Sequence, residues 1–147
     1  MQNSNFVVEQ PATKQDFETY YHLRYLVLRK PWGQPFGSEM DETDNTSIHA
    51  FIKDNNIAIS CSRLHFIDDT TAQIRYMAVH QDYQGKGLGK LVLTYLEEIA
   101  KENKRTDIIL HARENAIKFY ESCGYVIKEK SYLLWGEIQH HLMEKKL

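Results

Sequence analysis

The chain has few of the features that mark secreted, membrane-spanning or metal-binding proteins. Its two cysteines, Cys61 and Cys123, form no Cys-x-x-Cys or Cys–His pairing of a metal site. This excludes a disulfide framework and favours two buried thiols in a reducing compartment. The sequence has no run of about eighteen apolar residues, and residues 1–8 do not join a basic segment to an apolar one. We therefore expect neither a membrane span nor an export signal, and a cytoplasmic location.

An excess of charge of either sign is also lacking. The chain has 18 basic and 20 acidic residues and a formal net charge of −2. Such a balance provides no broad attraction to nucleic acid or to an anionic membrane, so we expect neither as a partner. The 147 residues, 42% of them hydrophobic, are enough for one globular domain spanning 1–147.

Glycine is scarce, but three of the seven glycines fall within five residues. Gly85, Gly87 and Gly89 belong to the segment Gln84-Gly85-Lys86-Gly87-Leu88-Gly89. From Leu88 the apolar residues recur at helical spacing, which predicts an amphipathic helix that reaches about Asn103. Glycines allow left-handed backbone angles, and the first turn of a helix has amide groups without intrahelical partners. The segment therefore predicts a phosphate-binding turn.

The remaining pattern predicts an α/β fold. Thr13 is the expected N-cap of a first helix that ends before Pro31, and a long loop follows over 31–46. Three strands at 47–53, 57–67 and 72–79 predict an antiparallel meander, and a strand at 107–112 predicts a parallel pair formed after the glycine-led helix. A short helix at 114–122 should end at Gly124, and two last strands are expected at 125–134 and 138–144.

Residue spacing separates this glycine segment from two common phosphate loops. A Walker loop would need glycine at Gln84 and a hydroxyl residue at Leu91, and a dinucleotide fingerprint would need glycine at Lys90. The segment instead has the form Gln/Arg-x-x-Gly-x-Gly/Ala and follows a predicted strand at 74–79. A glycine turn that only reverses the chain is the alternative.

A second motif lies at 110–125, with the pattern Ala-x-x-Phe-Tyr-x-x-x-Gly-Phe/Tyr from Ala116 to Tyr125. In this order and at this separation, the two motifs resemble those of the GNAT family of N-acetyltransferases. The resemblance implies a GNAT-like, acyl-CoA N-acyltransferase fold: an α/β domain with a mixed, mostly antiparallel central sheet and helices on both faces. Gln81 stands where the family often has proline, and Arg113 where it commonly has an asparagine. Asn115 comes two positions late to replace that asparagine.

The resemblance also implies acetyl-CoA as co-substrate and assigns roles to residues. Two neighbouring strands would splay apart, so that the backbone of the first binds the pantetheine arm, supplies an amide to the oxyanion and leads into the pyrophosphate loop. Tyr120 would donate a proton to the departing thiolate, because an ordinary phenol is protonated at pH 7. A core tyrosine beside Phe119 is the alternative. The implied cofactor-binding residues are Met77, Ala78 and Val79 for the arm, and Gln84, Gly85, Lys86, Gly87, Leu88 and Gly89 for the pyrophosphate.

The general base stays open at this stage. Candidates are a bound water chain or one of the following side chains: Glu39, Asp41, Glu42, His49, His111 and Glu137. The acidic series from Glu39 to Asp44 could attract a cationic amine or could simply be a solvated loop. His140 and His141 have no neighbouring acidic or cysteine ligands and should alternate to opposite faces of a strand, so we expect no metal site.

The expected function is therefore transfer of an acetyl group from acetyl-CoA to a primary amine of a small molecule or peptide. The main alternative is a non-catalytic acyl-CoA-binding sensor or interaction module. A phosphate-binding regulatory domain unrelated to CoA is a third reading. The sequence does not identify the acceptor, and a homodimer could form if exposed tail strands pair between subunits.

Overall fold

The computed structural model describes residues 6–147, so residues 1–5 of the N-terminal stretch considered above lie outside the described residues. The first helix, α1 (Lys14–Leu28), starts with a capping box. The Thr13 side chain accepts a hydrogen bond from the Asp16 amide at 3.0 Å, and the Asp16 carboxylate accepts one from the Thr13 amide at 3.3 Å. This confirms Thr13 as the N-cap, because two amides without helical partners are bonded at once.

The central sheet has six strands in the order β1-β2-β3-β4-β6-β5. The meander of β1, β2 and β3 and the parallel pair of β3 with β4 are as predicted, and every other pairing is antiparallel. The insertion of β6 between β4 and β5 was not predicted. The strands are β1 (Ile48–Asp54), β2 (Ile57–Phe66), β3 (Thr71–Val79), β4 (Asp107–Arg113), β5 (Val126–Leu134) and β6 (Ile138–Lys146).

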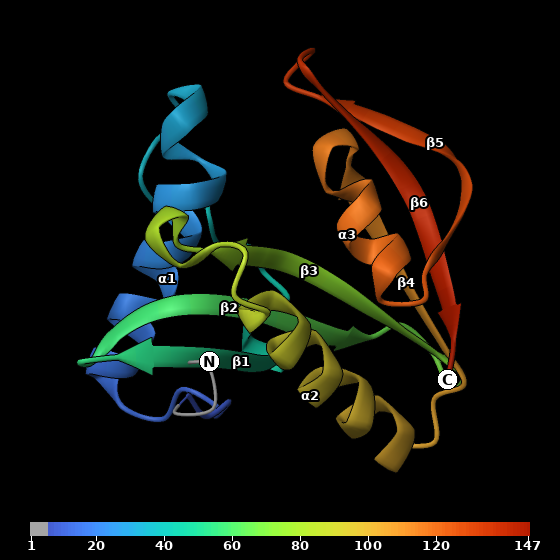
Figure 1. Cartoon of the computed structure of the whole chain (residues 1–147), viewed down its shortest axis with the longest axis horizontal. Coiled ribbons are helices and arrows are strands. Elements are labelled where there is room, and N and C mark those ends of the chain that lie inside the picture. The colour runs from blue at the N-terminus through green and yellow to red at the C-terminus, as the bar shows by residue number, and fades with distance from the viewer. Residues whose placement is uncertain (1–5) are drawn as a thin grey trace.

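Helices cover both faces of the sheet, as the family resemblance implied. Ala50 and Ile52 of β1 belong to the apolar cluster under α2 (Leu88–Glu102), whereas Phe51 between them belongs to the cluster under α1. This alternation follows from the two-residue period of a strand, and it gives the protein one core on each face. Figure 1 shows α1 and α2 on the two sides of the β1–β3 meander.

The parallel strands β3 and β4 pair over only part of their length. Pairing runs from Thr71 with Asp107 to Ile74 with Leu110, after which the strands separate. The β2–β3 register shifts at the same level, where Tyr76 has a left-handed φ of 57°. A bulge of this kind bends a strand and increases its twist, so β3 turns away from β4. In Figure 1 the two strands meet near the C-terminus and then diverge.

The segment after β4 differs slightly from the prediction of one short helix. It begins as a 3-10 turn, Glu114–Ala116, and continues as α3 (Ile117–Ser122). Gly124 ends α3 as predicted, with a φ of 96°, while the amide of Tyr125 donates to the carbonyl of Tyr120 at 3.0 Å. This Schellman-type helix end requires a residue with left-handed backbone angles, which favours glycine. Two further short 3-10 turns, Lys30–Trp32 and Asp44–Thr46, lie in the long loop, and a third, Gln81–Tyr83, follows β3.

The two cysteines differ in environment. Cys61 is fully buried, and burial raises the pKa of its thiol to about 12. Cys123 is only half-buried, so the prediction of a buried thiol was wrong there, because the residue follows the last turn of α3 at the surface. Among the helices of residues 6–147, none has the length and apolar character needed to cross a membrane.

Candidate active site

A cavity of about 1010 Å³ occupies the opening between β3 and β4. It is lined by the diverging ends of both strands, the start of α2, α3, and the end of α1. Most of the residues implied as cofactor-binding or catalytic line this one cavity: Met77, Ala78, Val79, Gln84, Gly85, Gly87, Leu88, Gly89 and Tyr120. Lys86 lies between two of these glycines and is exposed.

One edge of β3 faces the cavity. Ala78 and Val79 pair with Cys61 and Ser60 of β2 on one side, but the pairing with β4 has already ended at Ile74. The edge that faces the departing β4 can therefore accept an extended ligand as if it were another strand.

The turn after β3 presents backbone rather than side chains. Gly85 and Gly87 have φ values of 77° and 78°, and a β-carbon on Gly85 would meet nothing within 4 Å. Gly87 is the N-cap of α2 and offers no side-chain cap, so the first-turn amides of the helix point toward the turn. The Gln84 side chain donates to the carbonyl of Val79 at 3.2 Å, which holds the turn against the end of β3. This arrangement suits an anion, and Lys90 adds a positive charge on the cavity wall.

Tyr120 lies on α3, with its ring packed against Phe119 and Tyr125 at centroid distances of 5.0 and 5.8 Å. Its hydroxyl forms no hydrogen bond with any residue in the described part of the chain, although the residue lines the cavity. Burial raises the pKa of this phenol well above its ordinary value, so the hydroxyl keeps its proton at neutral pH.

Among the base candidates, His111 lies on the cavity wall. Burial lowers the pKa of its imidazole, and the positive charge of Arg75 lowers it further. Its Nδ1 atom is buried without a hydrogen-bond partner among residues 6–147, and its ring contacts that of Tyr132 at 5.4 Å. A neutral imidazole in this position can accept a proton.

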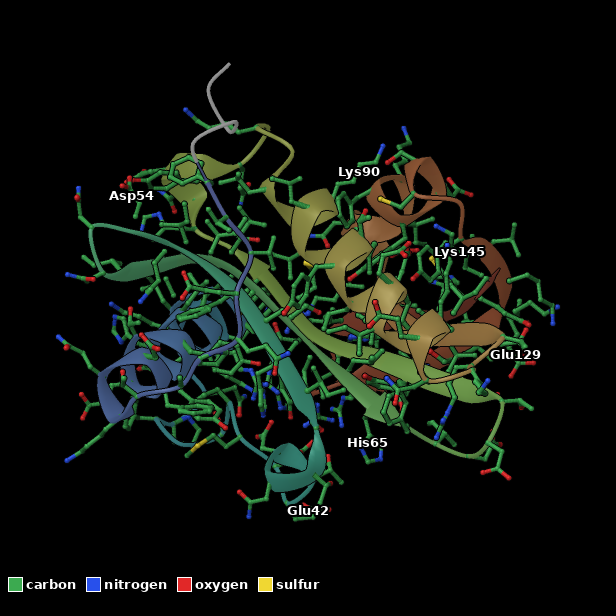
Figure 2. The ribbon with its side chains drawn as sticks, turned by 90° about the horizontal axis from the view of Figure 1, so that it is seen from below. Glu42, Asp54, His65, Lys90, Glu129 and Lys145 are labelled. Carbon is green, nitrogen blue, oxygen red and sulfur yellow. The ribbon has the colours of Figure 1, made fainter. Side chains whose placement is uncertain are left out.

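The acidic loop does not face the cavity, which overturns the idea that it attracts a cationic amine there. Asp41 accepts from Arg63 at 2.7 Å and from Arg75 at 3.1 Å, and Asp44 pairs with Arg24 at 3.0 Å. The loop is therefore held mainly by the buried Arg24 and Arg63, and these ion pairs occupy the carboxylates of Asp41 and Asp44. In Figure 2 Glu42 of this loop lies at the opposite edge of the molecule from Lys90.

The other side chains considered as bases also lie outside the cavity lining. His49 is buried between the Tyr20 hydroxyl at 2.6 Å and the Asp44 carbonyl at 2.8 Å. Glu39 is buried and accepts a hydrogen bond from the Gly37 amide at 2.7 Å. Glu42 and Glu137 are exposed. Of the six side chains named from the sequence, only His111 lines the cavity.

The comparisons with known proteins agree with this geometry. Residues 13–125 match the model of the "Acetyltransferase (GNAT) family". The chain belongs to the GNAT acetyltransferase family. A Bacillus subtilis protein named as an acetyltransferase is 29% identical over 142 residues, which cover 95% of each chain.

Solved structures of GNAT proteins share the fold. An N-acetyltransferase structure from Lactobacillus plantarum superimposes with a TM-score of 0.84 at 25% identity, covering 97% of this chain and 98% of the other. A GNAT family acetyltransferase from Elizabethkingia anophelis, solved with acetyl-CoA bound, gives a TM-score of 0.79 at 18% identity over 97% and 99% of the chains. Acetyl-CoA is thus the co-substrate that fits this GNAT chain.

His140 is a member of the GNAT cavity that sequence reasoning considered only as a metal ligand. It is buried on β6 opposite Arg113 of β4, and its ring stacks on Tyr132 at 4.3 Å. Its Nδ1 lies 3.0 Å from the Ile138 carbonyl, which can only accept, so a neutral His140 carries its proton on Nδ1 and leaves Nε2 as an acceptor. Burial lowers its pKa despite that bond. No sequence spacing signals this placement, because it depends on β6 pairing with β4.

Three arginines of the GNAT cavity were also missed as a group: Arg29, Arg75 and Arg113. Within residues 6–147, no aspartate or glutamate is part of the cavity lining. The part of the chain that the structure describes also holds no group of three histidine, cysteine or acidic side chains placed to bind a metal ion.

Proposed function

We propose that this GNAT protein is an N-acetyltransferase that moves an acetyl group from acetyl-CoA to a primary amine within a ternary complex. One observation carries the proposal: the free edge of β3, the glycine turn at the start of α2 and Tyr120 all line the same cavity. The cavity also has a second wall, formed by α1, β4 and β6, on which an acceptor can lie.

The residues present fit the CoA part of the co-substrate. The backbone of Met77, Ala78 and Val79 would hold the pantetheine arm as an added strand. The segment from Gln84 to Gly89 would hold the pyrophosphate, because the space beside Gly85 is open and a side chain there would fill it. Lys86 adds positive charge on the same turn.

The chain's own side chains can manage the two protons of the reaction. Bound acetyl-CoA supplies a thioester, whose C–S bond breaks as the amine nitrogen bonds to the carbonyl carbon. Tyr120 donates its hydroxyl proton to the departing thiolate, and His111 or His140 accepts the proton lost by the amine, directly or through water. An amide of the 77–79 stretch would stabilise the negative charge on the carbonyl oxygen. Holding both reactants in one cavity contributes through proximity.

Two measurements test the proposal. Isothermal titration calorimetry of the purified protein with CoA should give a saturable heat of binding, and thiol release from acetyl-CoA should depend on an added amine. Binding of CoA without thiol release for any amine in a broad panel would support the non-catalytic sensor instead. Absence of CoA binding would overturn both readings.

The proposed setting is the cytoplasm, which is supported by the two free cysteines. A homodimer is proposed through β5, the outer strand of the sheet, which exposes Val126, Ile127 and Leu133. Sedimentation velocity of the full chain checks the second point: a single species of the monomer mass of 17.3 kDa across the micromolar range would refute it.

A further inference from the structure

Two guanidinium groups in the cavity converge on a single backbone oxygen. Arg29 donates from Nη1 to the Leu28 carbonyl at 3.0 Å, and Arg113 donates from Nη2 to the same oxygen at 3.1 Å. Arg29 ends α1, whereas Arg113 ends β4, so the contact joins the two sides of the cavity 85 residues apart in sequence. One shared carbonyl brings the two cations close together.

Neither cation is neutralised by a carboxylate in residues 6–147. Arg29 and Arg113 form no salt bridge there, and Glu39, the carboxylate that most affects the pKa of Arg29, is outside ion-pair distance. The contrast with Arg24 and Arg63 is clear, because those two pair with Asp44 at 3.0 Å each. Arg24 and Arg63, which lie outside the cavity lining, therefore have carboxylate partners, whereas Arg29 and Arg113, which line the cavity, have none in residues 6–147.

Keeping these two guanidinium groups without a carboxylate partner costs free energy, because Arg29 is buried and Arg113 is partly buried. Arg29 is 9% exposed, and burial lowers its pKa. Burial, and after it the charge of Arg29, lower the pKa of Arg113 to about 10. A buried charge is stable only when an opposite charge or several hydrogen bonds compensate it, and a guanidinium fork matches the oxygens of a carboxylate or phosphate.

Aromatic rings hold the two guanidinium groups in place. Arg113 lies over the Trp32 ring at 4.5 Å, and Arg29 lies over the Trp135 ring at 5.2 Å. The two indoles are 6.2 Å apart, so they form one continuous support. Positions fixed in this way reduce the entropy lost when an anion binds.

We propose that the acceptor amine carries an oxyanion, a carboxylate or a phosphate, and that Arg29 and Arg113 bind this group while the amine lies near Tyr120. Arg113 and Tyr120 line the same cavity, so an anion on Arg113 would be held in the cavity that contains the proposed proton donor. The inference rests on the proposed acetyl transfer and specifies its acceptor. It disfavours polyamines and other acceptors with several positive charges, which this cavity would repel.

Matched pairs of acceptors test the proposal on the intact protein with saturating acetyl-CoA. The first set compares α-amino acids with their C-terminal amides, and the second compares O-phosphoethanolamine with ethanolamine. Spermidine is the multiply charged probe. We expect kcat/KM for thiol release to favour the anionic member of at least one set by about thirtyfold or more. The carboxylate and phosphate arms show which oxyanion is used.

Two outcomes are distinguishable from failure of the proposed function. If amides, ethanolamine or spermidine are acetylated as efficiently as the anionic amines, this inference is wrong and acetyl transfer stands. If CoA binds but no amine at all releases thiol, the acetyl-transfer proposal itself fails.

Substitutions at Arg113 test whether the arginine pair causes the preference for anionic amines. Arg113→Gln should reduce the ratio of kcat/KM between the anionic amine and its uncharged partner by about thirtyfold. Arg113→Lys keeps a positive charge but loses the two-pronged guanidinium group. Its kcat/KM ratio should lie between that of the unmodified protein and that of Arg113→Gln. Because Arg113 also bonds to α1, a purely structural loss would lower both rates together and leave their ratio unchanged, which would overturn the assignment. Arg105→Gln is the matched control, since Arg105 stacks on Phe66 away from the cavity lining and its loss should not change the ratio.

Discussion

Gly89 and Phe119 are in such close contact that a β-carbon on Gly89 would lie 3.2 Å from the Cζ atom of the Phe119 ring. The contact packs the first turn of α2 directly against α3. The Val79 side chain of β3 would lie 3.4 Å from the same β-carbon, so it also limits the space at Gly89. Unlike Gly85 and Gly87, Gly89 has ordinary helical angles, so steric space rather than backbone conformation requires glycine here.

We expect Gly89→Val to lower the free energy of unfolding by about 1–3 kcal/mol, because the extra atoms must displace Phe119 or Val79. It should also weaken CoA binding, since the turn and α3 would move apart. Urea denaturation and calorimetry with CoA measure the two effects. Adding Phe119→Leu should recover part of the stability lost, and a strictly additive double variant would argue against the contact as the cause.

Tyr120→Phe tests the proposed proton donor without changing the packing of the ring. We expect kcat to fall by about a hundredfold while the Kd for CoA stays within about twofold, because only the proton is removed. Stopped-flow or steady-state thiol release with parallel calorimetry measures both quantities. Tyr125→Phe is the control: it removes a hydroxyl that donates to Glu97 at 2.9 Å, so it should reduce stability but not kcat. Equal turnover of Tyr120→Phe and the unmodified protein would remove Tyr120 from the mechanism.

The two cavity histidines predict a pH dependence of stability. Burial lowers the pKa of His111 and of His140 in the folded state below the ordinary 6.5. The unfolded chain then binds more protons between the folded pKa and about 6.5, so stability rises with pH across this window, is complete above it and is lost on acidification. Urea denaturation between pH 5 and pH 8 should show this, and His111→Gln should reduce the slope by at most about 1.4 kcal/mol per pH unit.

The same histidines predict the acid limb of the activity profile. Because the neutral form persists below pH 6.5, kcat at saturating acetyl-CoA should stay level down to about that pH and fall only below it. His111→Gln and His140→Gln, each measured across the profile, identify which imidazole serves. If kcat of both variants falls over the same acidic pH range as kcat of the unmodified protein, the base is water or another group.

The ion pair that holds the acidic loop should contribute strongly to stability. Asp44 accepts from Arg24 and Arg63 at 3.0 Å each, and its side chain is 5% exposed. Asp44→Asn should lower the free energy of unfolding by about 3–5 kcal/mol, since it leaves two buried cations short of a partner. Glu98→Gln, which loses an exposed pair with Lys101, should cost less than about 1 kcal/mol. Chemical denaturation of both variants compares them, and a loss for Asp44→Asn as small as that for Glu98→Gln would contradict the role of the loop.

The local part of the fold could be predicted because neighbouring residues decide it. Thr13 and Asp16 cap α1 through their own side chains, and Gly124 ends α3 because its position requires a left-handed angle. The glycine turn before α2 was likewise predictable, since Gly85 and Gly87 take angles that other residues adopt at a cost. Spacing alone could thus place this glycine turn at the end of a strand.

The cavity wall formed by α1, β4 and β6 could not be predicted, because long-range contacts create it. His140 reaches the cavity only because β6 inserts beside β4, and the Asp41 and Asp44 carboxylates turn inward only because Arg24 and Arg63 lie buried behind them. Neither placement leaves a periodic signal, since a strand pattern is the same whichever neighbour it pairs with.

By itself, the sequence determined the approximate positions of the helices and strands and of the glycine turn before α2, because these depend on φ preferences, capping and apolar period. Only the tertiary structure decided which charges face the cavity. The Leu28 carbonyl accepts hydrogen bonds from Arg29, next to it in the chain, and from Arg113, 85 residues away. The two arginines come together only when the whole core folds, because that contact depends on burial and pairing throughout the chain.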